Sequence, residues 1–264
     1  MQIITEPTAR KEMLAVGKRL YEKGFVVATD GNLSVRLGNG RFLVSRSGVC
    51  KGDMVDQDLV ICDQNGNTIR GKRVSSEVLL HLAAYRIRPD VMAVIHAHPP
   101  VAVSFTLAGV SLEEALLPEV VMSLGKIPTS LFAAPASPEG AEVIRAEILH
   151  HDAIILDRHG SVTVGKTLWE AYHKLERLEF AAKVTHFAKS LGEVKPLSPE
   201  EMTQVQKSLD RYRASSTDRC PQCGGPAHHH RNIVPDTDNP DQTLWADLER
   251  LAPLIKRVID EGRM

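Results

Sequence analysis

Several features that would assign a protein to a partner or a compartment are missing from this 264-residue sequence. Its 32 lysines and arginines are balanced by 33 aspartates and glutamates, so the formal net charge is only −1. A chain with this balance lacks the basic surface that nucleic-acid binding requires, and its 43% hydrophobic content is that of an ordinary folded domain. Charge alone therefore nominates no partner.

Long apolar runs and paired cysteines are scarce as well. No segment approaches the ~18 continuous apolar residues that cross a bilayer, and the N-terminus shows no charged leader followed by an apolar core. Of the four cysteines, Cys50 and Cys62 stand apart while Cys220 and Cys223 form a CxxC pair, which is not the pattern of a disulfide scaffold. We expect a globular cytoplasmic protein that binds neither nucleic acid nor membrane.

Apolar periodicity predicts the helices and strands. The predicted helices cover residues 8–23, 76–88, 101–108, 139–151, 168–189 and 199–213. The predicted strands cover residues 32–36, 41–45, 59–62, 94–98 and 153–156, and short strands or loops are expected at 120–122 and 127–135. The core-facing positions of the helix over 168–189 are expected to include Leu175, Leu178, Ala182 and Phe187.

Two histidines separated by one residue, His96 and His98, follow the apolar residues of a predicted buried strand. Side chains at i and i+2 of a strand point to the same side, so this pair presents two nitrogen donors to one point in space. A catalytic Zn²⁺ site needs three protein ligands and an open position, and the pair supplies two of them. The plainer alternative is two ordinary polar residues at the end of a strand.

His159 is the best third ligand, because it follows the predicted strand over 153–156 and stands beside Gly160. A surface histidine in a turn is the alternative. His81 competes poorly as a ligand, since it falls within a predicted helix. Glu77 is the natural acid/base partner, because a carboxylate beside a metal that polarises a carbonyl can move a proton at the adjacent carbon. Its position in the first turn of the helix over 76–88 is equally explained by a helix stabilisation of ~0.5 kcal/mol.

Three turns are rich in small hydrogen-bond donors that could hold a phosphate without a basic patch. They are Gly31-Asn32, Ser47-Gly48 and Ser75-Ser76. Taken singly, each of them is only a turn.

These motifs, taken together and in order, resemble the class II aldolase/adducin family, which includes the L-fuculose-phosphate aldolases and the L-ribulose-phosphate 4-epimerases. The likeness covers roughly residues 8–190. It is carried by Gly31-Asn32-Leu33-Ser34, Ser47-Gly48, Ser75-Ser76-Glu77, His96-Ala97-His98, Leu117-Pro118-Glu119 and His159-Gly160. The resemblance implies an α/β/α sandwich around a mainly antiparallel sheet, assembled as a homotetramer with active sites between subunits.

The resemblance also implies a role for each motif. Zn²⁺ would be bound by His96, His98 and His159, with Glu77 as the acid/base and as a ligand that substrate can displace. The phosphate would be held by Asn32, Ser47, Gly48, Ser75 and Ser76. The implied reaction is retro-aldol cleavage of a (deoxy)ketose 1-phosphate, such as L-fuculose 1-phosphate, into dihydroxyacetone phosphate and an aldehyde such as lactaldehyde, by way of a metal-stabilised enediolate.

One departure from the family pattern concerns the aldehyde. The fuculose-phosphate aldolases use a tyrosine from the neighbouring subunit as a further proton donor, and the corresponding residues here, 116–120, contain none. Glu119 could approach the substrate instead, or form a salt bridge at the surface. A sugar-phosphate 4-epimerase, a dehydratase of the same family, and a noncatalytic adducin-like interaction domain are the alternative functions.

The second departure is the C-terminal extension. We expect a catalytic domain over 1–192, a helix over 193–213, a linker over 214–240 and an amphipathic helix over 241–264. The linker's Cys220 and Cys223 could hold a structural metal together with nearby histidines, or belong to a flexible segment. The terminal helix resembles the encapsulation peptides that direct enzymes into bacterial microcompartments by binding shell proteins; alternatively, it packs on its own subunit or a neighbour.

Overall fold

The structure, a computed structural model, describes residues 4–215. The strands are β1 (Asn32–Gly38), β2 (Arg41–Ser45), β3 (Leu59–Cys62), β4 (Thr68–Arg70), β5 (Ala93–Ala97), β6 (Thr129–Ser130), β7 (Ala153–Leu156) and β8 (Gly160–Gly165). The helices are α1 (Glu6–Glu22), α2 (Val78–Ile87), α3 (Pro100–Leu107), α4 (Pro118–Ser123), α5 (Pro138–Glu142), α6 (Arg145–Ile148), α7 (Leu168–Leu191) and α8 (Pro199–Ser215). Within these residues no helix is long and apolar enough to cross a membrane. The expected linker from residue 216 onward, with Cys220 and Cys223, and the expected terminal helix over 241–264 lie outside the described residues.

One sheet of eight strands organises the fold, in the order β4-β3-β2-β1-β5-β8-β7-β6. Neighbouring strands are antiparallel except for β6 and β7, which run parallel. The hairpin between β1 and β2 turns at Asn39, which has a φ of 51°. The glycines on either side of it, Gly38 and Gly40, have positive φ as well. Such left-handed backbone is the geometry that tight hairpin turns require. The expectation of a mainly antiparallel sheet is confirmed.

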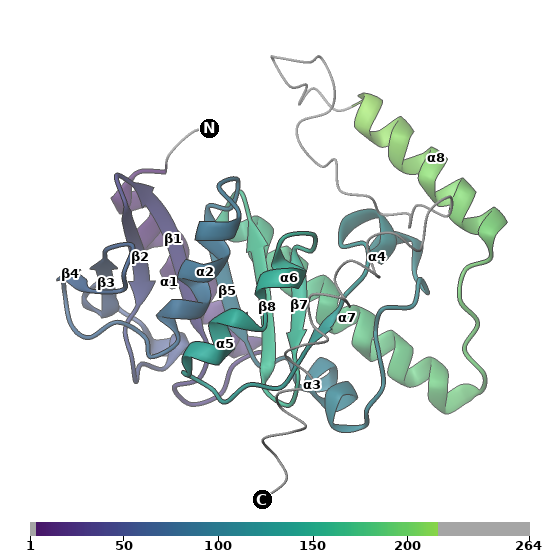
Figure 1. The fold of residues 1–264 in the computed structure, drawn as a ribbon, viewed down its shortest axis with the longest axis horizontal. Helices are drawn as coiled ribbons and strands as arrows, with labels where there is room; N and C mark the ends of the chain where they lie inside the picture. Colours follow the sequence, from purple (N-terminus) through teal and green to yellow (C-terminus); the bar gives the residue numbers. More distant parts are fainter. Residues whose placement is uncertain (1–3, 216–264) are drawn as a thin grey trace, which may run out of the picture. The chain divides into compact units, whose positions relative to one another are not determined.

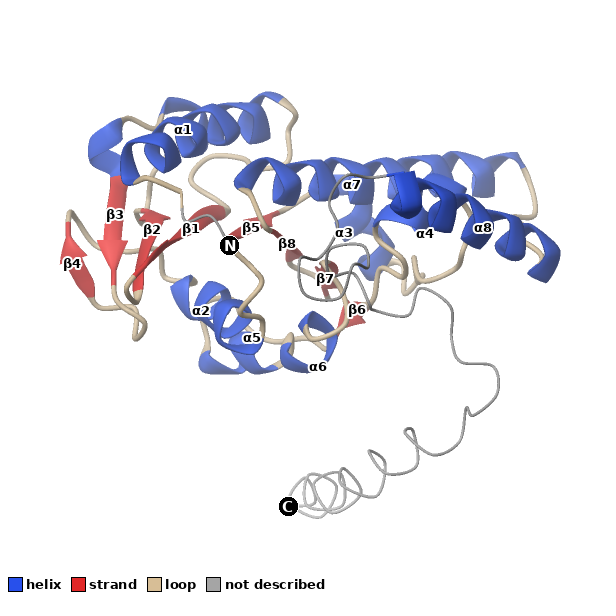
Figure 2. Ribbon diagram, turned by 90° about the horizontal axis from the view of Figure 1, so that it is seen from above, coloured by secondary structure: helices blue, strands red, loops and turns tan. Residues whose placement is uncertain are grey.

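Helices lie in front of the sheet and behind it (Figure 1), and alternation along the strands divides the core between these two layers. In β5, Ala93, Ile95 and Ala97 pack in one cluster with α1 and α7, whereas Val94 packs in another with α2 and α6. Figure 2 shows the same division from above, with α1 and α7 on one side of the sheet and α2, α5 and α6 on the other. Because side chains alternate between the faces of a strand, one sheet supports both helical layers. This is the expected α/β/α sandwich.

Three details differ from the expectations. Residues 120–122 belong to helix α4 rather than to a strand or loop, because Pro118 at the first helical position starts a helix there. The single helix expected over 139–151 is split into α5 and α6 by a turn at residues 143–144. Phe187 is 63% exposed instead of core-facing. It lies five residues after the buried Ala182, a rotation of about 140° around the helix axis, so it points away from the core.

Helix α8 begins with a reciprocal cap. Glu201 Oε2 accepts a hydrogen bond from the Ser198 backbone N–H (2.7 Å), and Ser198 Oγ accepts one from the Glu201 N–H (3.2 Å). This capping box satisfies two backbone donors that the first helical turn leaves without partners.

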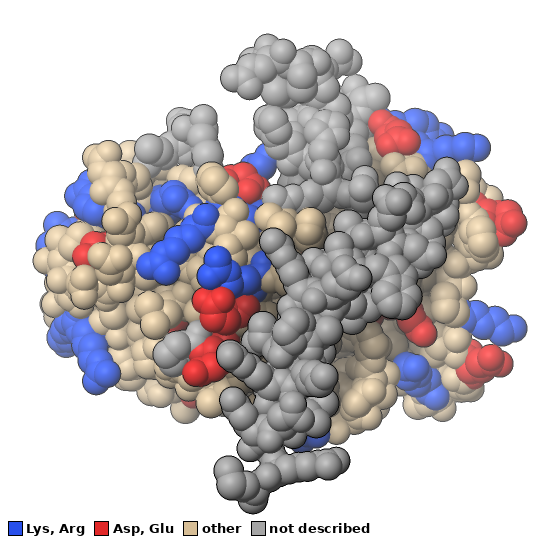
Figure 3. Space-filling model, viewed as in Figure 1, with Lys and Arg blue, Asp and Glu red and all other residues tan. Residues whose placement is uncertain are grey.

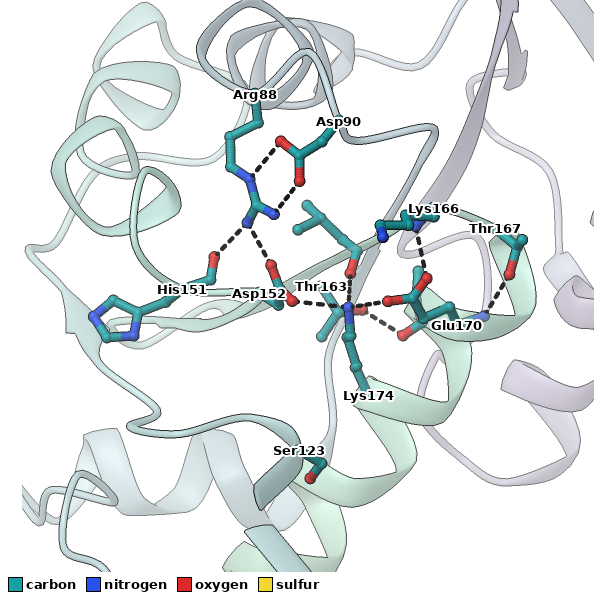
Figure 4. Close-up of polar contacts among 12 residues, drawn as sticks. Arg88, Asp90, Ser123, His151, Asp152, Thr163, Lys166, Thr167, Glu170 and Lys174 are labelled. Atoms are coloured by element: carbon teal, nitrogen blue, oxygen red, sulfur yellow. Dashed lines mark hydrogen bonds and ion pairs between the residues drawn. The ribbon is translucent and has the colours of Figure 1, made fainter. Parts of the chain in front are cut away.

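Charged side chains of both signs lie next to one another on the face seen in Figure 3. A buried charge network, shown in Figure 4, ties the two helical layers together at one end of the sheet. Asp152, which precedes β7, accepts hydrogen bonds from Lys174 of α7 (2.9 Å) and from Arg88 at the end of α2. Lys174 also donates to Glu170 (2.6 Å), and Arg88 to Asp90 (2.6 Å). Burial pushes the pKa of the Asp152 carboxyl upward, but Lys174 and Arg88 outweigh it and hold the pKa at about 2.

The substitution Asp152→Asn is expected to lower the free energy of unfolding at neutral pH by about 2–3 kcal/mol, because two buried cations lose their shared carboxylate. The folded pKa of about 2 lies below the ~3.9 of an unfolded aspartate, so this stabilisation is complete above about pH 4 and is lost as the pH falls through about 2. Urea unfolding of the parent protein and of Asp152→Asn between about pH 4 and about pH 2 measures how the difference in their free energies of unfolding shrinks.

The matched control is Glu142→Gln, which breaks the exposed ion pair between Arg145 and Glu142 on the protein surface. No measurable loss of stability is expected there. A difference between Asp152→Asn and the parent protein that stayed constant down to about pH 2 would show that the carboxylate charge is not its source.

Candidate metal centre and active site

Three histidines from two parts of the sheet meet at one point. His96 lies in β5, His98 directly after it, and His159 in the turn between β7 and β8. Their candidate ligand atoms all lie within 4.8 Å of one another, and the Nε2 atoms of His96 and His98 are 2.9 Å apart. The antiparallel pairing of β5 with β8, in which Ala97 faces Ser161, brings the turn of His159 beside the pair. The three residues expected to form a metal site are therefore together.

The imidazoles are oriented for coordination. His96 Nδ1 donates to the backbone carbonyl of Ser161 (3.0 Å), which leaves Nε2 facing the cluster. His98 Nδ1 lies 3.6 Å from a carboxylate oxygen of Asp30, an arrangement that likewise turns Nε2 inward. Burial, together with the charges of neighbouring histidines, lowers the pKa of His98 to about 4 and also lowers that of His159. At neutral pH these rings are thus neutral and offer the lone pairs that a metal needs.

The donor set fits a transition-metal dication. Three imidazoles that leave a further position open are what a catalytic Zn²⁺ site provides, and other divalent ions that favour imidazole can use the same set. Two ligands at ~2.05 Å in a tetrahedral site lie ~3.3 Å apart, which is close to the observed spacing of the Nε2 atoms. His96, His98 and His159 could therefore hold Zn²⁺.

Glu77 completes the cluster. Its Oε2 lies 3.2 Å from His96 Nε2, and its Oε1 lies 3.3 Å from His159 Nε2. Asn32 Nδ2 donates to Oε2 (3.1 Å). Burial raises the pKa of Glu77, but the hydrogen bond to His96, the charges of His96 and His159 and the bond from Asn32 together lower it to about 2. The carboxylate is therefore ionised in the free protein at neutral pH.

The position of Glu77 differs slightly from the expectation. It is the residue before the first turn of α2, which begins at Val78, and its side chain makes no capping bond to the helix. A residue at the cap is free of helical geometry, and here the side chain turns back toward the histidines. Glu77 therefore gives α2 no side-chain capping bond.

Two of the three turns expected to hold phosphate, Ser47-Gly48 and Ser75-Ser76, lie side by side. Ser47 and Gly48 follow β2, and the Ser47 backbone N–H donates to the carbonyl of Arg73 (3.2 Å), shortly before Ser75 and Ser76. Gly48 has a φ of 67°, and a Cβ there would meet nothing within 4 Å. Ser75 and Ser76 lead directly into Glu77, so these donors approach the histidine cluster from one direction.

Lys51 was missed by the sequence reasoning. Only 1% of the residue is exposed. Its Nζ donates to the backbone carbonyls of Thr29 (2.9 Å) and Val49 (2.5 Å). It thereby joins the loop before Asn32 to the loop after Gly48. Burial lowers the pKa of Lys51 to about 8. A single lysine in a loop carries no sequence signal for such a role, because lysines are mostly exposed.

Glu119 is not brought to the cluster in this chain. It lies exposed on α4, and among residues 4–215 its side chain makes no hydrogen bond or ion pair with the three histidines or Glu77. Helix α4 packs against α7 and α8, on the other side of the sheet from α2. A role for Glu119 at the site of its own chain has no support from this geometry.

A pocket opens beside Glu77 and His159, between α2, α5 and the segment around residues 130–137. Most of its lining is apolar or small, and none of the lining residues is a lysine or arginine. The lining residues are Ser76, Glu77, Leu79, Leu80, Ser130, Leu131, Ala133, Ala134, Pro135, Ala136, Ser137, Gly140, Val143, Leu156, Asp157 and His159. The pocket therefore borders the cluster at Glu77 and His159.

The chain is similar in sequence and in fold to several known proteins. The family model described as class II aldolase and adducin N-terminal domain matches residues 11–186. The 3-oxo-tetronate 4-phosphate decarboxylase of Haemophilus influenzae is 32% identical over 185 residues, 69% of this chain and 88% of that protein. The L-fuculose phosphate aldolase of Methanococcus maripaludis is 34% identical over 180 residues, 68% of this chain and 97% of that protein. A solved L-fuculose 1-phosphate aldolase superposes with a TM-score of 0.71 at 28% identity, covering 78% of this chain and 98% of the other.

Metal binding by the cluster can be tested with a matched pair of histidine substitutions. The parent protein is expected to bind one Zn²⁺ at this cluster. Loss of an outer partner of a metal ligand costs roughly 10–100-fold in affinity, and His159→Asn should weaken binding by more than that. His173→Asn, on the exposed face of α7, should leave binding unchanged. Calorimetric titration of metal-free protein measures both, and equal affinities in all proteins would contradict the assignment.

Proposed function

Because this chain belongs to the class II aldolase and adducin family, we propose that it is a metal-dependent aldolase that cleaves a ketose 1-phosphate such as L-fuculose 1-phosphate. The products would be dihydroxyacetone phosphate and an aldehyde such as lactaldehyde. The observation that carries the proposal is the convergence of His96, His98 and His159 with the carboxylate of Glu77 at the mouth of a pocket.

The chemistry follows from the charges in the site. Retro-aldol cleavage leaves negative charge on the fragment that carries the carbonyl, and a divalent ion held by the histidines would supply the positive charge that stabilises it. Glu77 is placed to hold or deliver the proton at the adjacent carbon, since its two oxygens lie against His96 and His159. The burial of these groups strengthens each of these interactions.

The pocket lining supports an aldehyde with an apolar end. Leu79, Leu80, Leu131 and Val143 would contact the part of the substrate that lies away from the phosphate loops. A terminal methyl group suits such a lining, whereas a second acidic group there would find no lysine or arginine to pair with. This favours a deoxy-ketose 1-phosphate among the substrates of the family.

A decarboxylase is the second candidate. The relative from Haemophilus influenzae carries that name at 32% identity. Loss of carbon dioxide from a 3-oxo acid also leaves negative charge beside a carbonyl, so the same cluster would serve it. A 4-epimerase or dehydratase would use the cluster in the same way. A noncatalytic adducin-like domain has no need of three histidines and an ionised glutamate held together, and is the least supported alternative.

A substrate panel separates these reactions. The zinc-loaded protein would be incubated with L-fuculose 1-phosphate, L-rhamnulose 1-phosphate, L-ribulose 5-phosphate and a 3-oxo-tetronate 4-phosphate. The expected result is dihydroxyacetone phosphate from a ketose 1-phosphate, without release of carbon dioxide. Carbon dioxide from the 3-oxo acid alone would instead establish the decarboxylase, and no turnover of any compound would reject an enzyme of this class.

Glu77→Gln tests the assigned proton carrier. The amide keeps the shape of the side chain but cannot take up a proton, so kcat should fall by about 10²–10⁴-fold while bound Zn²⁺ is retained. Turnover and metal content are measured on the same preparation. Undiminished turnover at full metal content would refute the role of Glu77.

The assembly and the cellular location remain part of the proposal. We propose a homotetramer, in agreement with the resemblance described above; exposed Phe180, Phe187 and Leu191 on α7 support self-association. A cytoplasmic location is proposed as well. Targeting to a bacterial microcompartment through residues 241–264, and a metal at Cys220 and Cys223, stay predictions that fall outside the described residues.

A further inference from the structure

A line of buried polar side chains runs between α2 and β1 and ends at Glu77. Tyr85, Ser34, His81 and Asn32 are each at most 3% exposed. Tyr85 Oη lies 2.8 Å from Ser34 Oγ, and Ser34 Oγ lies 2.6 Å from His81 Nδ1. His81 Nε2 is hydrogen-bonded to Asn32 Oδ1, and Asn32 Nδ2 reaches Glu77 Oε2 at 3.1 Å. The four side chains therefore form a continuous chain of contacts to the carboxylate.

The hydrogen bonds in this chain all run in one direction. A carboxylate can only accept, so the Asn32 amide presents its NH₂ group to Glu77 and its oxygen to His81. That oxygen also only accepts, so His81 must carry its hydrogen on Nε2, and its Nδ1 accepts from the Ser34 hydroxyl. Ser34 Oγ is then left to accept from Tyr85. Burial lowers the pKa of His81 to about 3, which leaves the ring with the single hydrogen that this pattern requires.

Packing alone does not explain this chain of polar side chains, because their burial costs free energy. Each polar group taken out of water costs free energy unless it is hydrogen-bonded, and a buried network costs most when it is only partly satisfied. Leu82 and Ala84 of the same helix fill the layer between α2 and the sheet without that cost. A fully satisfied chain that ends on the carboxylate points to a task at the carboxylate.

We propose that His81 is a positioning residue for Glu77: its Nε2 hydrogen fixes the amide of Asn32, and Asn32 in turn holds the Glu77 carboxylate against His96. The proposal rests on the proposed function, since it concerns the group assigned there to proton transfer. Without the hydrogen on His81 Nε2, the Asn32 amide can turn its oxygen toward Glu77. Two acceptors would then face each other, and the carboxylate would rotate away from His96.

A direct part for His81 in chemistry is excluded by its surroundings. Its side chain is fully buried, and both ring nitrogens are engaged, one by Ser34 and the other by Asn32. It reaches neither the pocket beside Glu77 nor the three histidines that could bind metal. It therefore acts through Asn32.

Two amide substitutions that differ by one methylene test this role. In His81→Gln the terminal amide can take the place of Nε2 and donate to Asn32, whereas in His81→Asn it reaches only the place of Nδ1. With L-fuculose 1-phosphate, His81→Asn should lower kcat about 10–100-fold with little change in KM, and His81→Gln should recover most of that loss. Leu82→Ala, a packing control on the same helix, should lower the Tm without lowering the kcat of the folded enzyme.

Equal losses of kcat in His81→Asn and His81→Gln, or a loss in Leu82→Ala as large as that in His81→Asn, would overturn the proposal. A second measurement needs neither substrate nor metal. NMR of the metal-free protein labelled with ¹⁵N-histidine should show His81 as the neutral Nε2–H tautomer from about pH 5 to about pH 8. An Nδ1–H tautomer or a charged ring would overturn it. If the parent protein cleaves no ketose 1-phosphate, the proposed function fails, and the tautomer alone decides the positioning.

Discussion

The antiparallel pairing of β1, β5 and β8 is the constraint on which the site depends. In its register Asn32 faces His96 across one strand pair, and Ala97 faces Ser161 across the other. The first pairing places the amide that contacts Glu77, and the second brings the turn of His159 to the histidine pair. A shift of either pair by one residue would move His96 to the face of the sheet that packs against α1 and α7, and the cluster would be lost.

The scaffold and the site each bury a carboxylate, and they stabilise its charge in different ways. At one end of the sheet, Asp152 is buried between Lys174 and Arg88, and every group is matched by a fixed partner of opposite charge. At the other, Glu77 is buried against His96 and His159, whose rings offer lone pairs to a metal cation. The first arrangement stabilises the fold. The second leaves the partner of the carboxylate open to exchange, which is what a reaction at this position requires.

In the proposed function, substrate choice depends on parts of the chain other than the cluster. The three histidines and Glu77 suit any reaction of the family that develops negative charge beside a carbonyl, which agrees with relatives named as an aldolase and as a decarboxylase. The lining of the pocket between α2, α5 and residues 130–137 differs from the cluster, because it offers apolar contacts and no basic side chain. The proposed function therefore places the reaction type in the rigid strands, and the preference for one substrate in the segments that border them.

The sequence by itself determined what depends on local spacing: the pairing of His96 with His98 on one side of a strand, the hairpin of β1 and β2, and the period of most helices. Strand and helix positions nominated His159 and Glu77 as candidates, and the resemblance to a family joined them to the pair although they lie far apart along the chain. Only the tertiary structure decided the helix at 120–122, the exposure of Phe187 and the parts played by Lys51 and His81. The reason is physical. Burial and hydrogen-bond direction belong to pairs of groups that folding brings together, and a lone lysine in a loop or a lone histidine in a helix carries no local pattern that reveals its partner.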